Sequence, residues 1–136
     1  MLFDTNVILD VMLDRKPHAA ASSSAWAIVE AGKMEGLLSA HAVTTIYYLV
    51  RKETGAAKAG RIVSSILRVF GVAPVDGEVI HEALQLPFSD FEEAVTAAAA
   101  RRADCGYIVT RDPKGFRGSS VRAFTPEAIL PLLGEE

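Results

Sequence analysis

Short apolar segments alternate with longer segments of helical periodicity along the chain, and this alternation constrains the fold more than any other sequence feature. Apolar residues in the longer segments recur at three- and four-residue intervals, which is typical of a helix with one buried face. Strands that alternate with helices form a parallel sheet with helices on both faces. The expected strands are 1–3, 36–40, 71–75, 107–109 and 121–124, and the expected helices are 7–14, 18–31, 41–53, 56–70, 78–85, 89–103 and 126–133.

The composition fits one globular domain that spans residues 1–136. Apolar residues make up 50% of the chain and the formal net charge is only −3, which excludes a disordered protein. Cys105 is the single cysteine, so a disulfide framework is excluded. The longest run without Asp, Glu, Lys or Arg, residues 36–50, is shorter than the ~20 residues of a membrane helix, and the N-terminus lacks the basic region of a secretory signal. We therefore expect a cytoplasmic protein without a membrane partner.

The mildly acidic balance, 17 acidic against 14 basic side chains, bears on nucleic-acid binding. Proteins held to nucleic acid by their overall charge are usually basic. A nucleic-acid role for this chain therefore has to rest on a local patch or on metal ions.

Acidic residues fall where strands end or where a helix begins. Asp4 follows the first strand, Asp112 follows the strand 107–109, and Asp90 opens the helix before that strand with Glu93 one turn further on. Ligands of parallel α/β sheets gather outside the carboxyl ends of the strands. Carboxylates that converge there repel one another unless a cation lies between them, and oxygen ligands suit Mg²⁺ or Mn²⁺. The pattern therefore suggests metal-assisted hydrolysis of a phosphodiester.

Each of these acids also has a structural interpretation, which spacing alone leaves open. Asp4 can cap a helix, Asp90 can complement a helix dipole, and Asp112 before a proline is a common turn residue. Ser89 and Glu92 form the Ser-x-x-Glu pattern of a capping box.

Four motifs follow one another along the chain. They are Phe3-Asp4-Thr5-Asn6-Val7, Asp90-Phe91-Glu92-Glu93-Ala94, Ile108-Val109-Thr110-Arg111-Asp112-Pro113-Lys114-Gly115-Phe116 and Phe124-Thr125-Pro126-Glu127. In this order they resemble the PIN-domain family, which includes the VapC-like toxins of toxin–antitoxin pairs. The resemblance implies a Rossmann-like, three-layer α/β/α sandwich with a central, mainly parallel sheet. It also implies a Mg²⁺- or Mn²⁺-dependent endoribonuclease that cleaves single-stranded RNA, forms a homodimer and has an antitoxin partner.

The resemblance also implies roles for individual residues. The catalytic acids, which would also bind the metal, are Asp4, Asp90 and Asp112, with Glu93 as a further ligand. The supporting polar residues are Thr5, Asn6, Thr45 and Thr110. Apart from the resemblance, basic side chains of this kind either contact RNA phosphates or form a solvated rim, and the candidates for phosphate contact are Arg15, Arg111 and Lys114.

Two positions depart from the family pattern. Thr45 stands where the family often has a Glu in its middle helix, and Gly115 stands where it often has an Asp. Fewer carboxylates weaken the charge compensation of a second metal ion, whereas one ion held by Asp4, Asp90 and Asp112 is compatible with the residues present. The alternative is a catalytically weak or inactive PIN domain that binds RNA or a protein partner.

Other chemistries find little support in the sequence. A phosphatase of the haloacid-dehalogenase type needs a second Asp two residues after the first, and this chain has Asn6 there. His18, His41 and His81 lack the spacing of metal ligands and are interpreted as surface or capping residues.

Overall fold

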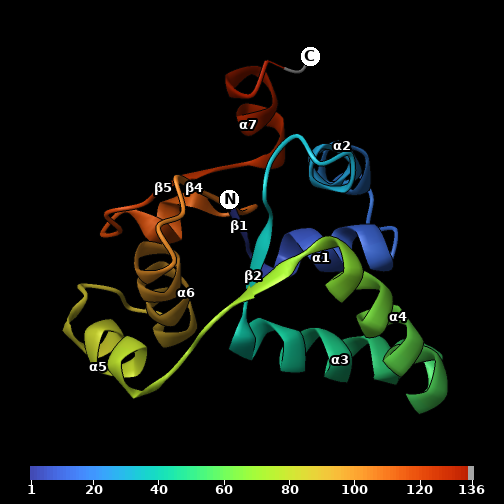
Figure 1. Cartoon of the computed structure of the whole chain (residues 1–136), viewed down its shortest axis with the longest axis horizontal. Coiled ribbons are helices and arrows are strands. Elements are labelled where there is room, and N and C mark those ends of the chain that lie inside the picture. Colours follow the sequence, from blue (N-terminus) through green and yellow to red (C-terminus); the bar gives the residue numbers. More distant parts are fainter. Residues whose placement is uncertain (135–136) are drawn as a thin grey trace.

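A central parallel sheet organises the computed structural model, which describes residues 1–134 (Figure 1). The strands are β1 (Leu2–Phe3), β2 (Leu37–Ser39), β3 (Gly71–Ala73), β4 (Tyr107–Val109) and β5 (Arg122–Phe124). They lie in the order β3-β2-β1-β4-β5, and every neighbouring pair is parallel. All carboxyl ends therefore meet at one edge of the sheet, as the alternation of strands and helices predicts.

The helices connect these strands. They are α1 (Thr5–Met12), α2 (Ala19–Glu30), α3 (Ala40–Thr54), α4 (Ala56–Val69), α5 (Gly77–Gln85), α6 (Phe91–Arg102), the 3₁₀ turn η1 (Pro113–Phe116) and α7 (Pro126–Leu132). Among residues 1–134, no helix has the length and apolar character needed to cross a bilayer.

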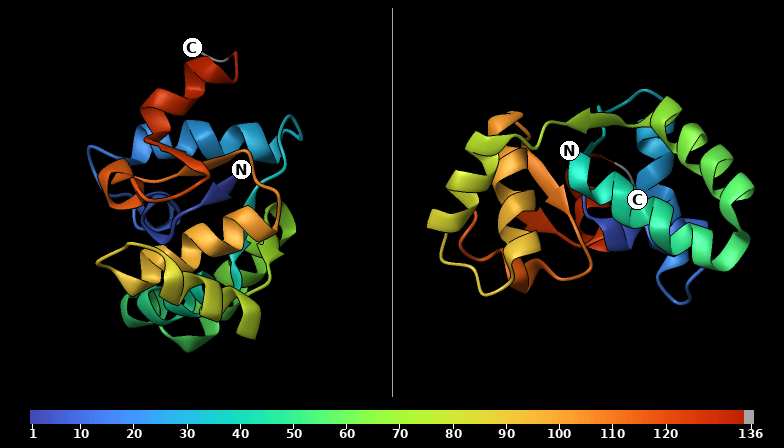
Figure 2. Two further views of the ribbon diagram at one scale, coloured as in Figure 1. Left: turned by 90° about the vertical axis from the view of Figure 1, so that its left-hand side faces the viewer. Right: turned by 90° about the horizontal axis from the view of Figure 1, so that it is seen from below.

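Successive strand residues face opposite layers. Phe3, Leu38 and Val109 lie in one core with side chains of α1 to α4 and α7. Leu2 and Ile108 lie in a second core with side chains of α5 and α6. Accordingly, α5 and α6 lie on one side of the sheet and α1 and α2 on the other (Figure 2). This arrangement confirms the expected three-layer α/β/α fold.

Helix α6 packs closely on the sheet because its buried side chains are mostly alanines, from Ala94 to Ala100. Its N-cap is Asp90, whose Oδ1 accepts the Glu93 N–H at 3.0 Å. The expected capping box of Ser89 and Glu92 is therefore wrong by one residue. The helix begins one residue later, and the Asp90 side chain, in place of Ser89, accepts the free N–H group of the first turn.

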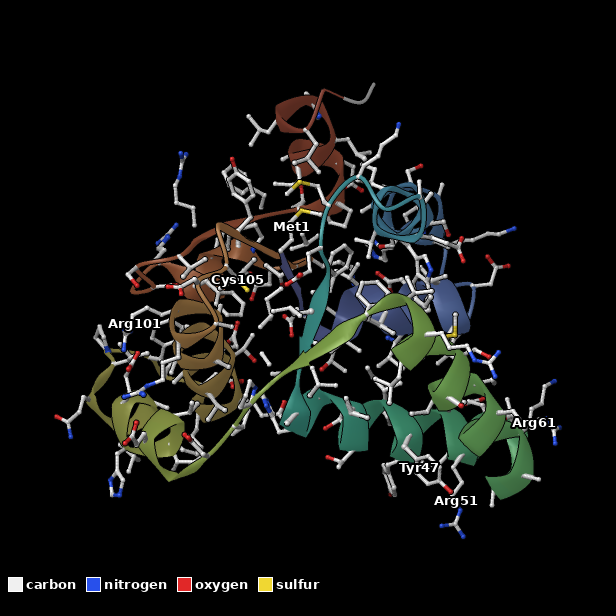
Figure 3. The ribbon with its side chains drawn as sticks, viewed as in Figure 1. Met1, Tyr47, Arg51, Arg61, Arg101 and Cys105 are labelled. Carbon is white, nitrogen blue, oxygen red and sulfur yellow. The ribbon has the colours of Figure 1, made fainter. Side chains whose placement is uncertain are left out.

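Ion pairs on the outer side of α6 hold α5 beside it. Arg101 Nε donates to Glu82 at 2.6 Å, and Arg102 donates to Glu78 at 2.8 Å and to Glu82 at 3.1 Å. Figure 3 shows Arg101 on this side of the sandwich, far from Tyr47 and Arg51 on α3. These exposed pairs contribute little each, but they fix the orientation of the helix that carries Asp90 and Glu93.

Phe70 is expected to be a major contributor to stability. Its ring is 2% exposed and packs edge-on against Phe3 at 5.0 Å and Trp26 at 4.9 Å. We expect Phe70→Ala to lower the free energy of unfolding by about 3–5 kcal/mol in urea titrations, because the site cannot refill the volume of the ring. Leu84→Ala, at a side chain that is 62% exposed, should change it by less than ~0.5 kcal/mol. Equal losses in the two variants would contradict this assignment.

Candidate active site

The connections that follow β1 and β4, which are neighbours in the sheet, run to opposite faces of the sheet. The chain leaves β1 into α1, which packs in the first core, and leaves β4 into η1, whose Phe116 packs in the second core. The two connections therefore diverge to opposite faces and leave a crevice at the carboxyl edge. Ligands of open α/β sheets bind at such switch points.

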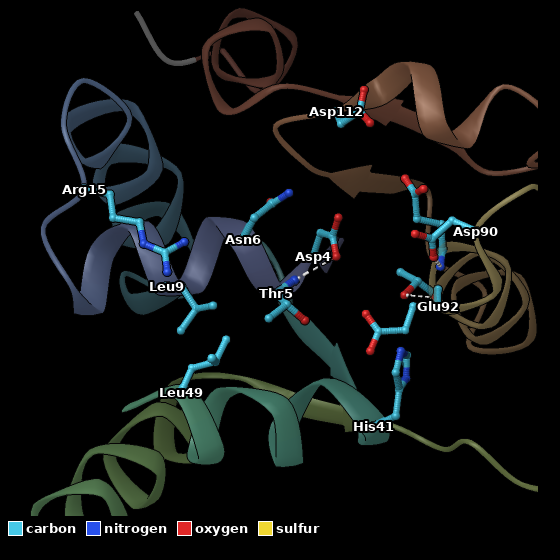
Figure 4. Close-up of a pocket in the computed structure, with 12 residues that line it drawn as sticks. Asp4, Thr5, Asn6, Leu9, Arg15, His41, Leu49, Asp90, Glu92 and Asp112 are labelled. Carbon is cyan, nitrogen blue, oxygen red and sulfur yellow. Dashed lines mark hydrogen bonds between the residues drawn. The ribbon is translucent and has the colours of Figure 1, made fainter. Parts of the chain in front are cut away.

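A cavity of about 360 Å³ occupies this crevice. Its lining residues are Asp4, Thr5, Asn6, Leu9, Arg15, His41, Leu49, Asp90, Glu92, Glu93, Thr96 and Asp112. In Figure 4 the carboxylates of Asp90, Glu92 and Asp112 surround one end, with Asp4 near the centre, whereas Arg15 lies at the opposite end beside Leu9. The structure thus brings the four acids singled out in the sequence to one pocket, from three separate segments.

Asp4 occupies the centre of this arrangement. One carboxylate oxygen accepts the Thr5 N–H at 2.8 Å and the other accepts the Thr110 hydroxyl at 2.8 Å. Burial raises the pKa of the Asp4 carboxyl above its usual range, and the two hydrogen bonds oppose that shift. Asp4 is therefore both a helix cap and a pocket carboxylate, so its two sequence interpretations are compatible.

Thr110 connects the ends of β1 and β4. Its hydroxyl is buried, donates to Asp4 and accepts the Asp112 N–H at 3.1 Å. The next peptide is fixed as well, since Asn6 Oδ1 accepts the Arg111 N–H at 3.3 Å. These bonds position the turn that carries Asp112 relative to Asp4.

The acids of α6 enter the crevice from the other side. Asp90 caps the helix, and Glu93 lies one turn further on, facing η1. Burial raises the pKa of the Glu93 carboxyl, and repulsion from Asp90, Asp112 and Asp4 raises it further. Glu93 thus interacts electrostatically with each of the other three acids.

Four residues expected at the site lie outside the cavity lining, and Thr110 is one of them, although its hydroxyl contacts Asp4 and Asp112. The Thr45 hydroxyl donates back to the His41 carbonyl at 3.4 Å, within α3. Lys114 is exposed in η1. Arg111 Nε lies 3.0 Å from Asp10 Oδ2, and Asp10 is completely buried in α1. The structure therefore gives Arg111 a protein carboxylate as a partner, and its expected contact with RNA phosphate stays a prediction.

Two pocket residues escaped the sequence interpretation. His41, expected at the surface or as a cap, lines the pocket half-buried, and its Nδ1 has no hydrogen-bond partner among residues 1–134. Burial lowers the pKa of the His41 imidazole, while Glu92 and Asp4 oppose that shift. Glu92, expected only as a capping residue, also lines the pocket. The position of His41, two residues after β2, could have indicated that it lines the pocket, because that strand ends at the same sheet edge.

Together, these features define a three-layer α/β protein with an acidic pocket at the carboxyl edge of a parallel sheet. The sequence model of the PIN domain matches residues 1–114. The chain belongs to the PIN-domain family, which confirms the resemblance.

Individual relatives support this assignment over nearly the whole chain. Ribonuclease VapC1 of Aquifex aeolicus (strain VF5) is 26% identical over 129 residues, covering 91% of this chain and 88% of that protein. The structure of FitAcB from Neisseria gonorrhoeae superposes with a TM-score of 0.72 at 24% identity, covering 93% of this chain and 97% of that one. A toxin–antitoxin complex from Klebsiella pneumoniae gives a TM-score of 0.69 at 19% identity, covering 92% and 96%. These two structures share the fold of this chain.

The Asp10–Arg111 pair generates a stability prediction. Asp10 is fully buried, and Ser22 is a second, weaker partner at 3.4 Å. Arg111→Met leaves a buried carboxylate without its cation, so we expect the free energy of unfolding to fall by about 3 kcal/mol, the lower end for a buried pair because Arg111 is 32% exposed.

The matched variant removes both charges. Asp10→Leu with Arg111→Met should regain most of the loss in urea titrations, because no unpaired charge remains buried. Arg117→Met, at an exposed arginine of the same loop, is the control. A double variant as unstable as Arg111→Met alone would contradict the assignment.

The raised pKa of the Asp4 carboxyl generates a pH prediction. The folded state binds this proton more tightly than the unfolded state does, so the wild type loses stability as the pH rises past about 4, the ordinary pKa of an aspartate. Asp4→Asn abolishes that loss. In urea titrations without divalent metal, the free energy of unfolding of the variant should rise relative to that of the wild type between pH 4 and pH 7. A difference in free energy of unfolding that is constant over this range, or that favours the wild type more at pH 7, would contradict the prediction.

Proposed function

We propose that this protein is a divalent-metal-dependent endoribonuclease that hydrolyses phosphodiester bonds of single-stranded RNA. The observation that carries the proposal is the meeting of Asp4, Asp90, Glu93 and Asp112 in one pocket that also holds Arg15. Acids for a cation and an arginine for phosphate are the two components that a phosphodiesterase of this kind needs. The ribonuclease name of the Aquifex aeolicus relative supports the reaction class.

The donor set fits a hard divalent cation such as Mg²⁺ or Mn²⁺. All four groups are carboxylates, and burial raises the pKa of both Asp4 and Glu93, with neighbouring acids adding to the shift of Glu93. Among residues 1–134, no three His, Cys, Asp or Glu side chains are already gathered around one point. Asp4, Asp90, Glu93 and Asp112 are therefore the residues that would hold the ion after side-chain adjustment. A bound cation supplies charge neutralisation for the phosphodiester and activates water.

The residues of the chain itself account for binding and orientation. The Thr5 N–H and the Thr110 hydroxyl hold the Asp4 carboxylate toward the pocket at 2.8 Å each. Asn6 orients the peptide of Arg111 and thus the turn before Asp112. These hydrogen bonds fix the Asp4 carboxylate and the turn, so the adjustment needed on binding is confined to the other acidic side chains.

Arg15 gives the pocket a direction. Its side chain lies at the end opposite the acids and has no ion-pair or hydrogen-bond partner among residues 1–134 (Figure 4). Leu9 and Leu49 form an apolar surface beside Arg15, at the same end of the pocket (Figure 4). A strand whose scissile phosphate lies at the acids can therefore place a neighbouring phosphate at Arg15 and a base over the leucines, which favours an unpaired strand. Lys114, which is exposed in η1, is available for a further phosphate.

The partners are proposed on the same basis. A structural neighbour from Klebsiella pneumoniae is described as a toxin–antitoxin complex, which supports an antitoxin partner and a toxin role for this chain. The homodimer expected from the family resemblance stays a prediction.

Substitution of the pocket acids tests the proposed reaction. We expect the purified protein to cleave single-stranded RNA in the presence of Mn²⁺, and we expect Asp4→Asn and Asp90→Asn each to lower the rate by about 100-fold or more, because each removes a charged metal ligand. Cleavage is measured on a labelled oligonucleotide, with and without a chelator. Glu53→Gln, an exposed acid of α3 outside the pocket, is the control.

The same assay separates the two family interpretations. Cleavage that persists in both variants, or in excess chelator, would refute the metal mechanism. Binding of the oligonucleotide without any cleavage by the wild type would favour a PIN domain that acts as an RNA-binding module.

A further inference from the structure

Gly115 has no side chain at the point where the Glu93 carboxylate lies. A Cβ atom added to Gly115 would lie 2.7 Å from Glu93 Cδ and 2.9 Å from Oε1, and closer still to Oε2. Real Cβ atoms essentially never approach other atoms this closely, and the three nearest atoms all belong to Glu93. The two residues therefore compete for one volume, and glycine leaves it to the carboxylate.

The backbone itself does not require glycine at this position. Positive φ angles occur at Gly32, Gly55 and Gly134, whereas Gly115 lies inside η1, where its N–H donates to the Asp112 carbonyl at 3.2 Å. An L-residue can adopt this conformation. The obstruction to a Cβ at this position therefore comes first from the Glu93 carboxylate, which supplies the three nearest atoms.

The position matters because η1 begins next to Asp112. Glu93, held against Gly115, reaches from α6 toward the turn that carries this acid, and its carboxyl interacts with Asp112, Asp90 and Asp4. The pocket acids come from both walls of the crevice, and Glu93 lies at the contact between the walls.

We propose that Gly115 is a positioning residue for Glu93: its missing side chain provides the space that keeps the Glu93 carboxylate between α6 and η1, facing the other pocket acids. The inference rests on the proposed function in one respect, namely that the correctly placed carboxylate binds a divalent cation. It predicts that residue 115 controls metal affinity although it carries no ligand.

The shared volume has a reciprocal consequence. A carboxylate on residue 115 would occupy the same space as the Glu93 carboxylate. It would reach that space from η1, whereas Glu93 reaches it from α6. Glu93→Ala removes all three obstructing atoms. The exchange Glu93→Ala with Gly115→Asp should therefore return a carboxylate to the same region of the pocket.

Calorimetric titration of the full chain with Mn²⁺ alone tests this proposal. Gly115→Ala should weaken Mn²⁺ binding by about tenfold, the effect typical of residues that orient a ligand. It should do so without loss of the folded state, because a flexible glutamate can swing aside. In the Glu93→Ala background the same substitution should weaken binding no further, and the reciprocal exchange should recover most of the lost affinity. Gly106→Ala is the control, since nothing lies within 4 Å of its added Cβ.

Unfolding midpoints, measured without metal, test the steric part by itself. Gly115→Ala should raise the midpoint in the Glu93→Ala background, where it only restricts the unfolded chain, and should leave it unchanged or lower it in the wild type. Wild-type affinity in Gly115→Ala, or equal effects of Gly115→Ala on the midpoint with and without the Glu93 side chain, would overturn the proposal. Failure of the wild type to bind Mn²⁺ would instead refute the proposed metal function, and the midpoints would still decide whether Glu93 and Gly115 compete for space.

Discussion

The Thr110 hydroxyl is the group on which the geometry of this site depends. It is fully buried, donates to Asp4 and accepts the N–H of Asp112, while the Thr110 N–H donates to the Phe124 carbonyl at 2.9 Å. One side chain thus ties the ends of β1 and β4 together and fixes two pocket acids relative to one another. A hydrogen bond to a charged group contributes about 1.5–3 kcal/mol, which is enough to hold a buried carboxylate in one orientation. Thr110 directly follows β4, an interior strand of the sheet. The core contacts that hold β4 in place therefore also hold the site.

The fold carries electrostatic strain at this edge and compensates for it elsewhere. Asp4 and Glu93 both have a raised pKa, since burial and neighbouring acids disfavour their charged forms. Two apolar cores, one on each face of the sheet, supply the stability that lets such repulsion persist. Residues that lower stability while serving no packing role are expected at functional sites. A cation bound there would reverse the local sign of the charge, so a chain with a net charge of −3 can hold a phosphate at its most acidic point.

Local periodicity was sufficient to predict the layers of the fold, because each strand and helix has a distinct repeat of apolar residues. The strand 107–109 and the helix start at Pro126 agree with the structure. Tertiary contacts decided the rest. Arg111 adjoins Asp112 in sequence, but its guanidinium also pairs with the buried Asp10 a hundred residues away, a contact that sequence spacing does not reveal. Likewise, the family resemblance treats Gly115 as a missing acid, whereas the packing of α6 on η1 places the Glu93 carboxylate where a side chain of residue 115 would lie.

The turn after β4 therefore acts on three parts of the molecule through three neighbouring residues. Thr110 contacts the end of β1, Arg111 contacts α1 through Asp10, and Gly115 accommodates a side chain of α6. Each contact involves a different kind of interaction, namely a hydrogen bond, an ion pair and steric fit. The turn contacts three of the pocket acids, since Thr110 bonds to Asp4 and Asp112 and Gly115 lies against Glu93, so it sets their relative positions together with α6. Substitutions within residues 110–115 should therefore alter the site more than equally buried substitutions in the helices, even where they remove no carboxylate.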